Sequence, residues 1–196
     1  MVSKEELLEC SVANFTTFGS KHFTMDELAH TLGISKKTIY KYYSSKEELV
    51  IASVTCLVNT FRESTQKIIA AEEDPLSCII LLYDKGFESL KHFKPSFIFG
   101  LKKYYPEASK VFDDFRDEIV NEIVYGLLQK AQVLKCIRRD VNLKLFCELY
   151  FNRFEEIAFK NDSLFSTYSN DELLNHFVIF NLKGITTSSY NNSYFE

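Results

Sequence analysis

The 196-residue sequence contains little glycine and proline, with only six and three residues. This scarcity excludes collagen-like and low-complexity chains and leaves few positions for sharp turns. Aromatic residues are abundant instead, with 18 phenylalanines and 11 tyrosines, and 46% of all residues are hydrophobic. We therefore expect an all-α protein with long helices and a core built largely from rings.

The sequence also lacks a long apolar run. Its opening segment, MVSKEELLECSVANF, carries charges every few positions, and no stretch reaches the ~20 apolar residues of a membrane span. We therefore predict no signal peptide, no contact with a membrane and a cytoplasmic location.

Motifs for catalysis and metal binding are absent as well. The five cysteines are odd in number, widely spaced and without a CxxC pair, which gives no support to a disulfide framework or a zinc site. The four histidines form no HExxH pattern, and the sequence contains no GxGxxG loop, phosphate loop or nucleophile elbow. We predict that the protein is not an enzyme and needs no metal or cofactor.

An excess of positive charge is missing too, because 27 acidic residues outnumber 23 lysines and arginines and give a net charge of -4. Any binding to nucleic acid must therefore rest on a local patch. Such a patch lies between residues 35 and 46, where four lysines occur without an acidic residue. This segment is the first candidate for a contact with DNA.

Two short helices are predicted on either side of Gly33. Thr24 and Glu27 form a capping box, in which each side chain satisfies a free backbone amide at the start of a helix. Gly33 can adopt the positive φ angle that follows a helix end, and Ser35 can cap the next helix. A supporting helix from Ser3 to about residue 18 precedes the pair. This order is the outline of a helix-turn-helix.

The second helix of the pair has a basic face and an apolar anchor. A rotation of about 100° per residue places Lys36, Lys37, Tyr40 and Lys41 on one side and Ile39 on the other. Aromatic and hydroxyl side chains are interspersed with the lysines, and this mixture is typical of contacts with phosphates and base edges. The alternative is a solvated charged face, which describes most short lysine runs.

The same region resembles the N-terminal domain of the TetR family of transcriptional regulators. The resemblance covers about the first fifty residues, and its motifs are Phe15-x-x-x-Gly19 and the segments 24–29, 32–43 and 45–49. The sequence departs from the family at Ser20, where an aromatic residue is usual, and at Phe23, where a threonine is usual.

The resemblance implies a set of DNA-binding residues in the basic segment and at two helix starts. They are Thr24, Lys36, Lys37, Thr38, Tyr40, Lys41, Tyr42 and Lys46. Lys36 and Lys37 would contact base edges, since lysine can donate to guanine, whereas the hydroxyl groups suit phosphate oxygens. A short helix reads only a few base pairs, so we expect a homodimer on a palindromic operator in double-stranded DNA.

Capping residues and prolines predict further helices from about residues 45, 75, 95, 106, 140 and 170, which makes about nine in all. We expect a three-helix helix-turn-helix DNA-binding domain at 1–46 and a larger helical ligand-binding and dimerisation domain at 47–187. The last segment, 188–196, is rich in polar residues and is predicted to be a flexible tail.

The last two long helices carry more apolar residues than one buried stripe needs. The TetR resemblance implies that these helices pair with a second subunit. The candidates for that interface are Phe146, Tyr150, Phe154, Leu174, Phe177 and Val178. The alternative is that both stripes are covered within one subunit.

Aromatic residues are also dense in the middle helices, where the resemblance implies an effector pocket. The candidate lining residues are Phe87, Phe93, Phe97, Tyr104, Phe112 and Phe115. The alternative is a filled core, because rings at helical spacing more often pack than line a cavity. Few charges lie nearby in the sequence, which favours a small apolar or aromatic effector.

Together these features predict a ligand-responsive, sequence-specific DNA-binding regulator. We expect the protein to repress transcription rather than activate it, and to leave its operator when the effector binds. The rival hypothesis is a helical binding protein whose DNA contacts are architectural and largely nonspecific, and whose output runs through a protein partner.

Overall fold

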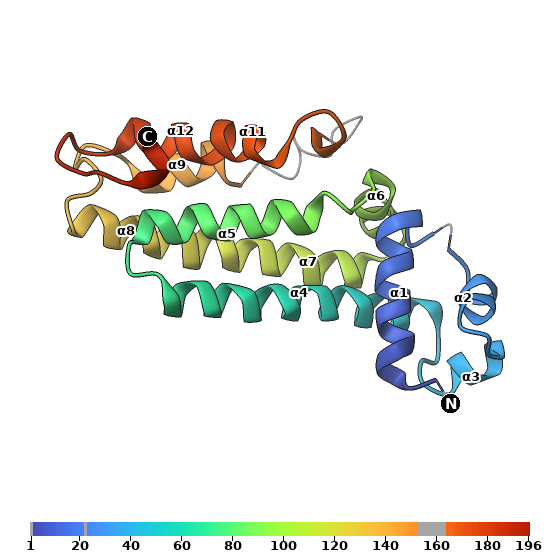
Figure 1. Cartoon of the computed structure of the whole chain (residues 1–196). Coiled ribbons are helices and arrows are strands. Elements are labelled where there is room, and N and C mark those ends of the chain that lie inside the picture. The colour runs from blue at the N-terminus through green and yellow to red at the C-terminus, as the bar shows by residue number, and fades with distance from the viewer. Residues whose placement is uncertain (1, 22, 153–163) are drawn as a thin grey trace. The chain divides into compact units, whose positions relative to one another are not determined.

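The computed structural model describes residues 2–21, 23–152 and 164–196 (Figure 1). In these ranges the regular structure is helical, apart from one isolated bridge between Ile137 and Thr186. Nine continuous helices occur in the described part of the chain, besides short 3-10 turns. The predicted all-α fold is confirmed. No helix among the described residues combines the length and apolar character needed to cross a membrane.

The helices follow one another with few long connections. The first four are α1 (Lys4–Phe18), α2 (Met25–Thr31), α3 (Lys36–Tyr40) and α4 (Lys46–Ala71). The next are α5 (Pro75–Leu90), α6 (Pro95–Tyr104) and α7 (Pro106–Asp117). α7 continues through the π-helical segment η1 (Glu118–Val124) into α8 (Tyr125–Val133). After α9 (Leu143–Tyr150), the last long helix comprises α11 (Asn170–Leu174), the π-helical η3 (Asn175–Ile179) and α12 (Phe180–Ile185). Two 3-10 turns are η2 (Leu164–Ser166) and η4 (Ser193–Phe195).

Local chemistry at the helix starts explains most of these boundaries. Ser3, Thr24 and Ser169 each begin a helix with a complete capping box. Pro75 and Pro95 lie in the first turns of α5 and α6, where a missing backbone amide costs nothing. The helix predicted to begin at residue 140 instead starts three residues later, because the side chain that caps it belongs to residue 142.

The described chain divides into two compact units. Unit 1 comprises Met1–Arg62 and His92–Phe115, and unit 2 comprises Glu63–Lys91 and Arg116–Glu196. This division differs from the predicted boundary between residues 46 and 47. Helix α6 and most of α7 are grouped with the N-terminal helices, and α4 contributes residues to both units.

Unit 1 is held together by the packing of α1 on α6 and of α2 on α3 (Figure 1). Its core includes Leu7, Phe15, Ile39 and Leu49, none of which is more than 1% exposed. Phe15 also meets the ring of Phe23 edge-on, with 6.0 Å between the centroids. Phe23 therefore serves the core at a position where the TetR family usually has a polar threonine.

Small residues allow α1 and α6 to approach closely. Gly19 ends α1 with a φ of +86°, and a Cβ atom there would lie 3.0 Å from the Ser96 hydroxyl. A Cβ atom on Gly100 of α6 would likewise lie 3.0 Å from the hydroxyl of Ser20, which is fully buried. The close approach of α6 explains why serine replaces the usual aromatic residue after Gly19.

In unit 2, α5 packs against α8 and against the last long helix. An aromatic cluster joins α5 to η2 and to α9 with the residue that follows it. Its ring contacts are Tyr83 stacked on Phe151 at 4.8 Å, Phe87 edge-on to Phe165 at 5.8 Å, and Phe146 edge-on to Phe151 at 5.6 Å. Burial raises the pKa of Tyr83, so its hydroxyl stays protonated.

The segment 188–196, predicted to be a flexible tail, instead has a docked conformation in unit 2. The Tyr190 hydroxyl donates to the Asp74 carboxylate at the start of α5, with 2.8 Å to each oxygen. The Asn192 amide donates to the Ser77 hydroxyl at 2.9 Å. The polar composition of the segment predicted that its side chains are solvated, whereas Tyr190 and Asn192 form hydrogen bonds with residues at the start of α5.

Candidate nucleic-acid interface

Helices α2 and α3 form a helix-turn-helix within unit 1. The Thr24 hydroxyl accepts from the Glu27 amide at 3.2 Å, and the Glu27 carboxylate accepts from the Thr24 amide at 2.6 Å. Gly33 adopts a φ of +63° after α2, and the Ser35 hydroxyl accepts from the Thr38 amide at 3.2 Å. The predicted caps and turn are therefore confirmed.

Helix α3 presents the predicted basic face to solvent. Lys36, Lys37, Tyr40 and Lys41 are exposed, whereas Ile39 is completely buried. The buried anchor fixes the helix on the core of unit 1, and the four exposed side chains can then meet the edge of a DNA groove.

Lys36 is paired with a carboxylate that the sequence reading missed. Its ammonium group donates to Asp26 of α2 at 2.9 Å, and both side chains are largely exposed. The hydrogen bond to Asp26 raises the pKa of Lys36 and keeps its charge. An exposed ion pair contributes little stability, so Lys36 can exchange Asp26 for an acceptor on DNA. The only sequence signal for this partner was its place on the exposed face of α2.

Two candidate phosphate contacts are engaged within the chain. The Thr38 and Ser35 hydroxyl groups lie 2.9 Å apart and share a hydrogen bond. The Tyr42 hydroxyl donates to the carbonyl oxygen of Val2 at 3.3 Å, and its side chain is half-buried. The Tyr42 hydroxyl must leave this carbonyl to donate to a phosphate, whereas the Thr38 hydroxyl can accept from Ser35 and donate its own proton.

Lys46 is also held by its own domain. Its ammonium group donates to the Lys21 carbonyl at 3.2 Å and lies 6.0 Å from the ring centroids of both Phe15 and Tyr105. Burial lowers the pKa of Lys46, although the nearby Glu27 carboxylate opposes this effect. Lys46 thus ties the start of α4 to the turn before α2, in addition to any role at a phosphate.

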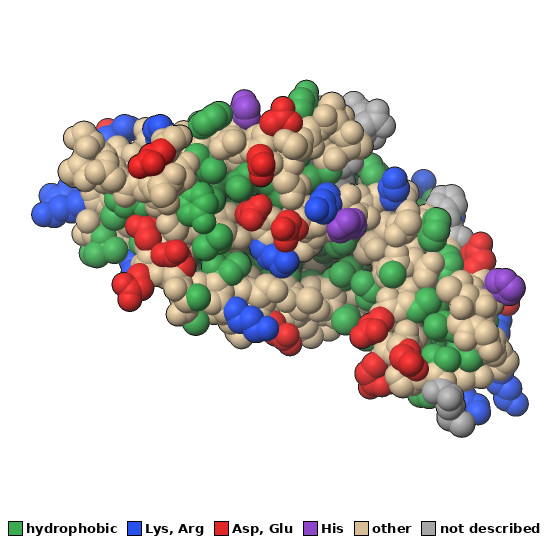
Figure 2. All heavy atoms as spheres, in the orientation of Figure 1, with side chains coloured by type: hydrophobic (Ala, Val, Ile, Leu, Met, Phe, Trp, Pro, Cys, Tyr) green, Lys and Arg blue, Asp and Glu red, His purple; other side chains and the backbone are tan. Residues whose placement is uncertain are grey.

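Charges of both signs are interspersed over the face that Figure 2 shows. On that face, acidic (red) and basic (blue) side chains are both scattered among apolar ones. This agrees with the net charge of -4 and with a DNA contact confined to a small part of unit 1.

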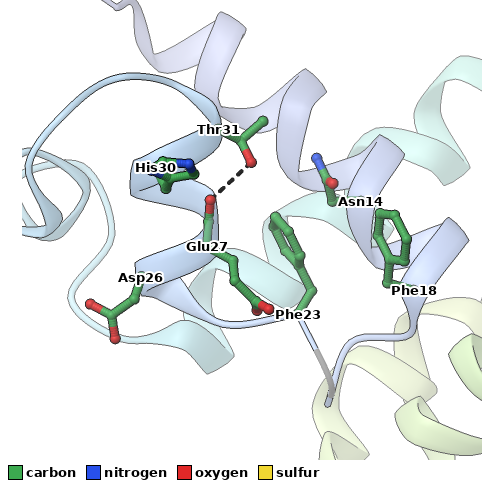
Figure 3. A pocket seen from close by; sticks show the side chains of 7 residues that line it. All are labelled: Asn14, Phe18, Phe23, Asp26, Glu27, His30 and Thr31. Atoms are coloured by element: carbon green, nitrogen blue, oxygen red, sulfur yellow. Dashed lines mark hydrogen bonds between the residues drawn. The ribbon is translucent and has the colours of Figure 1, made fainter.

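A hollow that the sequence did not predict lies between α1 and α2 (Figure 3). Its volume is about 740 Å³, and it is lined by Asn14, Phe18, Phe23, Asp26, Glu27, His30 and Thr31. Phe18 is 57% exposed and stacks on Phe23 at 6.1 Å. The two acidic side chains make this hollow a poor site for phosphate, and it shares no residue with the predicted effector pocket.

The six candidates for the effector pocket belong to several packing clusters. Phe87 lies in unit 2, and the other five lie in unit 1. Phe93 meets Phe97 edge-on at 5.4 Å, and Phe115 meets Phe61 edge-on at 5.6 Å. Tyr104 is 40% exposed, so it belongs to the surface of unit 1.

The predicted dimer interface is wrong for three residues. Phe146, Leu174 and Val178 are 6%, 8% and 0% exposed in a single chain, and they form part of the core of unit 2. For these residues the alternative reading, coverage within one subunit, is correct. The reason is that a helix period alone cannot tell which of two apolar stripes faces the chain's own core.

The remaining candidates have different surroundings. Tyr150 is 40% exposed, Phe177 is half-buried, and Phe154 lies outside the described residues. The exposed apolar side chains on α9 and α12 also include three residues outside the six interface candidates: Leu145 at 53%, Leu149 at 53% and Phe180 at 55%.

Comparisons with known proteins agree with this geometry. A family model described as "Bacterial regulatory proteins, tetR family" matches residues 7–53, which contain α2, α3 and the start of α4. Over 168 residues the chain is 30% identical to the uncharacterized HTH-type transcriptional regulator YvaF of Bacillus subtilis, covering 84% of this chain and 86% of YvaF. The chain belongs to the TetR family.

Other TetR-family relatives extend the comparison. The HTH-type transcriptional repressor KstR2 of Mycolicibacterium smegmatis is 24% identical over 149 residues, which cover 72% of this chain and 71% of KstR2. The crystal structure of the transcriptional regulator FadR from Bacillus subtilis in complex with stearoyl-CoA has a TM-score of 0.74. That match covers 93% of this chain and 100% of FadR at 18% identity, and it shows the shared fold.

Membership of the TetR family makes this chain a DNA-binding transcriptional regulator. Its relatives YvaF and KstR2 are named as a transcriptional regulator and a transcriptional repressor. Within the family fold, α2 and α3 are the helix-turn-helix, and the basic face of α3 is the candidate surface for reading DNA.

Proposed function

We propose that this TetR-family regulator is a cytoplasmic repressor that binds a palindromic operator as a homodimer and is released by a small apolar or aromatic effector. The observation that carries the DNA-binding part is the exposed face of α3, with Lys36, Lys37, Tyr40 and Lys41 around the buried anchor Ile39. KstR2 relatives described as repressors support the sign of regulation.

Lys36 and Lys37 are proposed to read base edges in the major groove. Both lie in the first turn of α3, the end of a recognition helix that meets the bases. Lysine donates to guanine O6 and N7, and loss of such a contact lowers discrimination by ~10- to 100-fold. Lys36 would leave Asp26 on binding.

The other six candidates are proposed as phosphate contacts that differ in how many existing hydrogen bonds they must give up. Tyr40 and Lys41 are exposed and need no rearrangement. The hydroxyl groups of Thr24, Thr38 and Tyr42 and the ammonium group of Lys46 already have partners within the chain. We therefore expect Tyr40 and Lys41 to contribute more to affinity than these four.

The dimer is proposed to form through the exposed apolar side chains of α9 and α12. Leu145 and Leu149 are one helical turn apart on α9, and each leaves about half of its surface in water. Because they are exposed in the single chain, Leu149→Asp should leave the protomer folded and shift a dimer to monomer in analytical ultracentrifugation. Ile69→Asp on α4 introduces the same charge at a 40% exposed position and should leave the dimer intact.

The effector is proposed to be apolar or aromatic because α5, α6 and α7 each carry aromatic residues. The six candidate lining residues stay a prediction, together with the cluster around Tyr83 in unit 2. The FadR structure contains stearoyl-CoA, which supports a long apolar ligand as one class to test. The effector would favour a conformation that binds the operator poorly, and by linkage the operator would weaken effector binding to the same extent.

Selection of bound DNA from a random pool tests the proposal. A recovered palindrome, bound ~10³-fold or more tightly than random DNA at one salt concentration, is the expected result. Equal affinity for both DNAs would favour the rival hypothesis of architectural, nonspecific binding. Alanine variants of Lys36, Lys37 and Tyr40 should lose operator binding and keep the dimer, and an unchanged footprint would refute their assignment.

A further inference from the structure

A second basic site lies in unit 1 outside the helix-turn-helix. Lys21, in the turn after α1, donates its ammonium group to the Tyr104 hydroxyl at 2.9 Å and lies 4.3 Å from the ring centroid. The ammonium group of Lys103 lies 5.4 Å from the same centroid. Two cations from separate segments thus converge on one exposed ring at the end of α6.

These cations are not neutralised within the part of the chain that the structure describes. Lys36, Lys85 and Arg138 each pair with a carboxylate, whereas Lys21 and Lys103 form no ion pair with a described residue. Their common partner is a neutral phenol. The hydrogen bond from Lys21 is the main cause that lowers the pKa of Tyr104, and no carboxylate is among the groups that shift this pKa. In a chain of net charge -4, this is an unusual concentration of positive charge.

The site also has an unused hydrogen-bond donor. The Tyr104 hydroxyl accepts from Lys21, and among the described residues its own proton has no acceptor. A phosphate oxygen placed beside Tyr104 could accept that proton while facing two ammonium groups. This combination suits a phosphate, which offers several acceptor oxygens and negative charge.

The second basic site is continuous with the candidate DNA interface. The Lys46 ammonium group donates to the Lys21 carbonyl at 3.2 Å, so the start of α4 contacts the residue that holds Tyr104. The Tyr105 hydroxyl donates to the Ser20 carbonyl at 3.4 Å, which ties the end of α6 to the same turn. Lys46, one of the predicted DNA contacts, is therefore bonded to the turn that carries Lys21, and α6 is bonded to the same turn.

A purely structural explanation accounts for only part of this arrangement. Lysines in the last turn of α6 are favoured by the negative end of the helix dipole. That effect explains Lys103, but Lys21 belongs to another segment and directs its charge to the same place. The Lys21 bond to Tyr104 also fixes the turn, yet any polar side chain of similar length could do this without a charge.

We propose that Lys21, Lys103 and Tyr104 form an auxiliary phosphate clamp that holds the DNA backbone flanking each operator half-site. The inference rests on the proposed function, because it assumes that α3 occupies an operator. It adds a DNA contact from α6, outside the helix-turn-helix, and it explains how an acidic chain with a short basic helix gains affinity.

The test compares salt dependence and duplex length for one operator recovered by selection. The double variant Lys21→Gln and Lys103→Gln removes two charges and keeps polar side chains of similar reach. Each lost phosphate contact lowers the slope of log K against log salt by about 0.9, so we expect a slope smaller by about 2 and a ~30-fold loss of affinity near 0.15 M salt. The matched control, Lys67→Gln with Lys110→Gln, removes two exposed charges elsewhere and should leave the slope unchanged.

Duplex length identifies the source of the phosphate. The wild type should bind a duplex extended by about half a turn, ~5 base pairs, beyond each end of the palindrome more tightly than one that ends with it. The double variant should bind both duplexes equally. Tyr104→Phe keeps the ring and both charges, so its affinity should fall about fivefold with no change in slope.

The outcomes separate this inference from the proposed function. A wild type without operator binding contradicts the proposed function itself. A wild type that binds its operator, with a double variant of unchanged slope, overturns the clamp alone. The clamp is also overturned if the double variant loses the same affinity on short and extended duplexes. Circular dichroism melting of each variant checks that it is folded.

Discussion

The contact between Ser20 and Gly100 allows a quantitative test of how α6 is seated on the turn after α1. The Ser20 hydroxyl is buried without a hydrogen-bond partner among the described residues, and it lies 3.0 Å from where a Gly100 Cβ atom would be. Apart from its chain neighbours and the backbone of its own helix, this Cβ would meet no other heavy atom of the described residues within 4 Å. The two positions should therefore be strongly coupled in a double-mutant cycle.

The expected magnitudes follow from three effects. Ser20→Ala removes a buried, unpaired hydroxyl and should stabilise the protein by about 1 kcal/mol. Gly100→Ala gains about 1 kcal/mol of helix propensity, but with Ser20 present the overlap costs about 1 to 3 kcal/mol. With Ala at position 20 the overlap is gone, so the same Gly100→Ala change should stabilise by about 1 kcal/mol. The predicted coupling energy is thus about 1 to 3 kcal/mol.

Urea denaturation at one fixed protein concentration measures the free energy of unfolding of the wild type, the two single variants and the double variant. Gly126→Ala in α8 is the control, because a Cβ atom there meets nothing within 4 Å and its effect should be the same in both backgrounds. If Gly100→Ala has the same effect with Ser20 and with Ala at position 20, within about 0.5 kcal/mol, the packing argument is refuted.

Two further predictions concern the tail and the capping boxes. Tyr190→Phe removes the hydrogen bond to the half-buried Asp74 carboxylate and should lower the free energy of unfolding by about 1–2 kcal/mol in urea. Tyr194→Phe should change this free energy little, and equal effects of the two variants would show that the tail is not docked. Hydrogen bonds from the Ser169 backbone and side chain lower the pKa of Glu172 from its ordinary 4.5, so the folded state is stabilised above pH 4.5 and loses this contribution as the pH falls through the lowered value. Glu172→Gln should therefore reduce the loss of stability between neutral and acid pH, and an unchanged pH profile would contradict the capping role.

The sequence alone determined the helix-turn-helix of unit 1 because its signals are local. A capping box, a glycine with positive φ and one turn of helical periodicity each depend on residues within about four positions. Thr24, Gly33 and the exposed face of α3 were predicted for this reason, and the structure agrees. The scarcity of glycine and proline likewise indicated long helices, and the excess of aromatic residues indicated ring-rich cores.

Contacts between distant segments decided what periodicity could not. Periodicity predicts Phe146 and Val178 at a partner subunit, but both are buried within unit 2 of the single chain. The convergence of Lys21 on Tyr104 joins residues 83 positions apart, and the docking of Tyr190 on Asp74 joins residues 116 positions apart.

The physical reason for this division is the range of each interaction. Backbone amides at a helix end are satisfied by neighbours in the chain, so a short motif specifies them fully. Burial of an apolar stripe and pairing of a charge depend on which other segment lies opposite. The sequence of this TetR-family regulator thus determined that it has a DNA-reading helix, and the tertiary structure decided which distant residues contact one another within each unit.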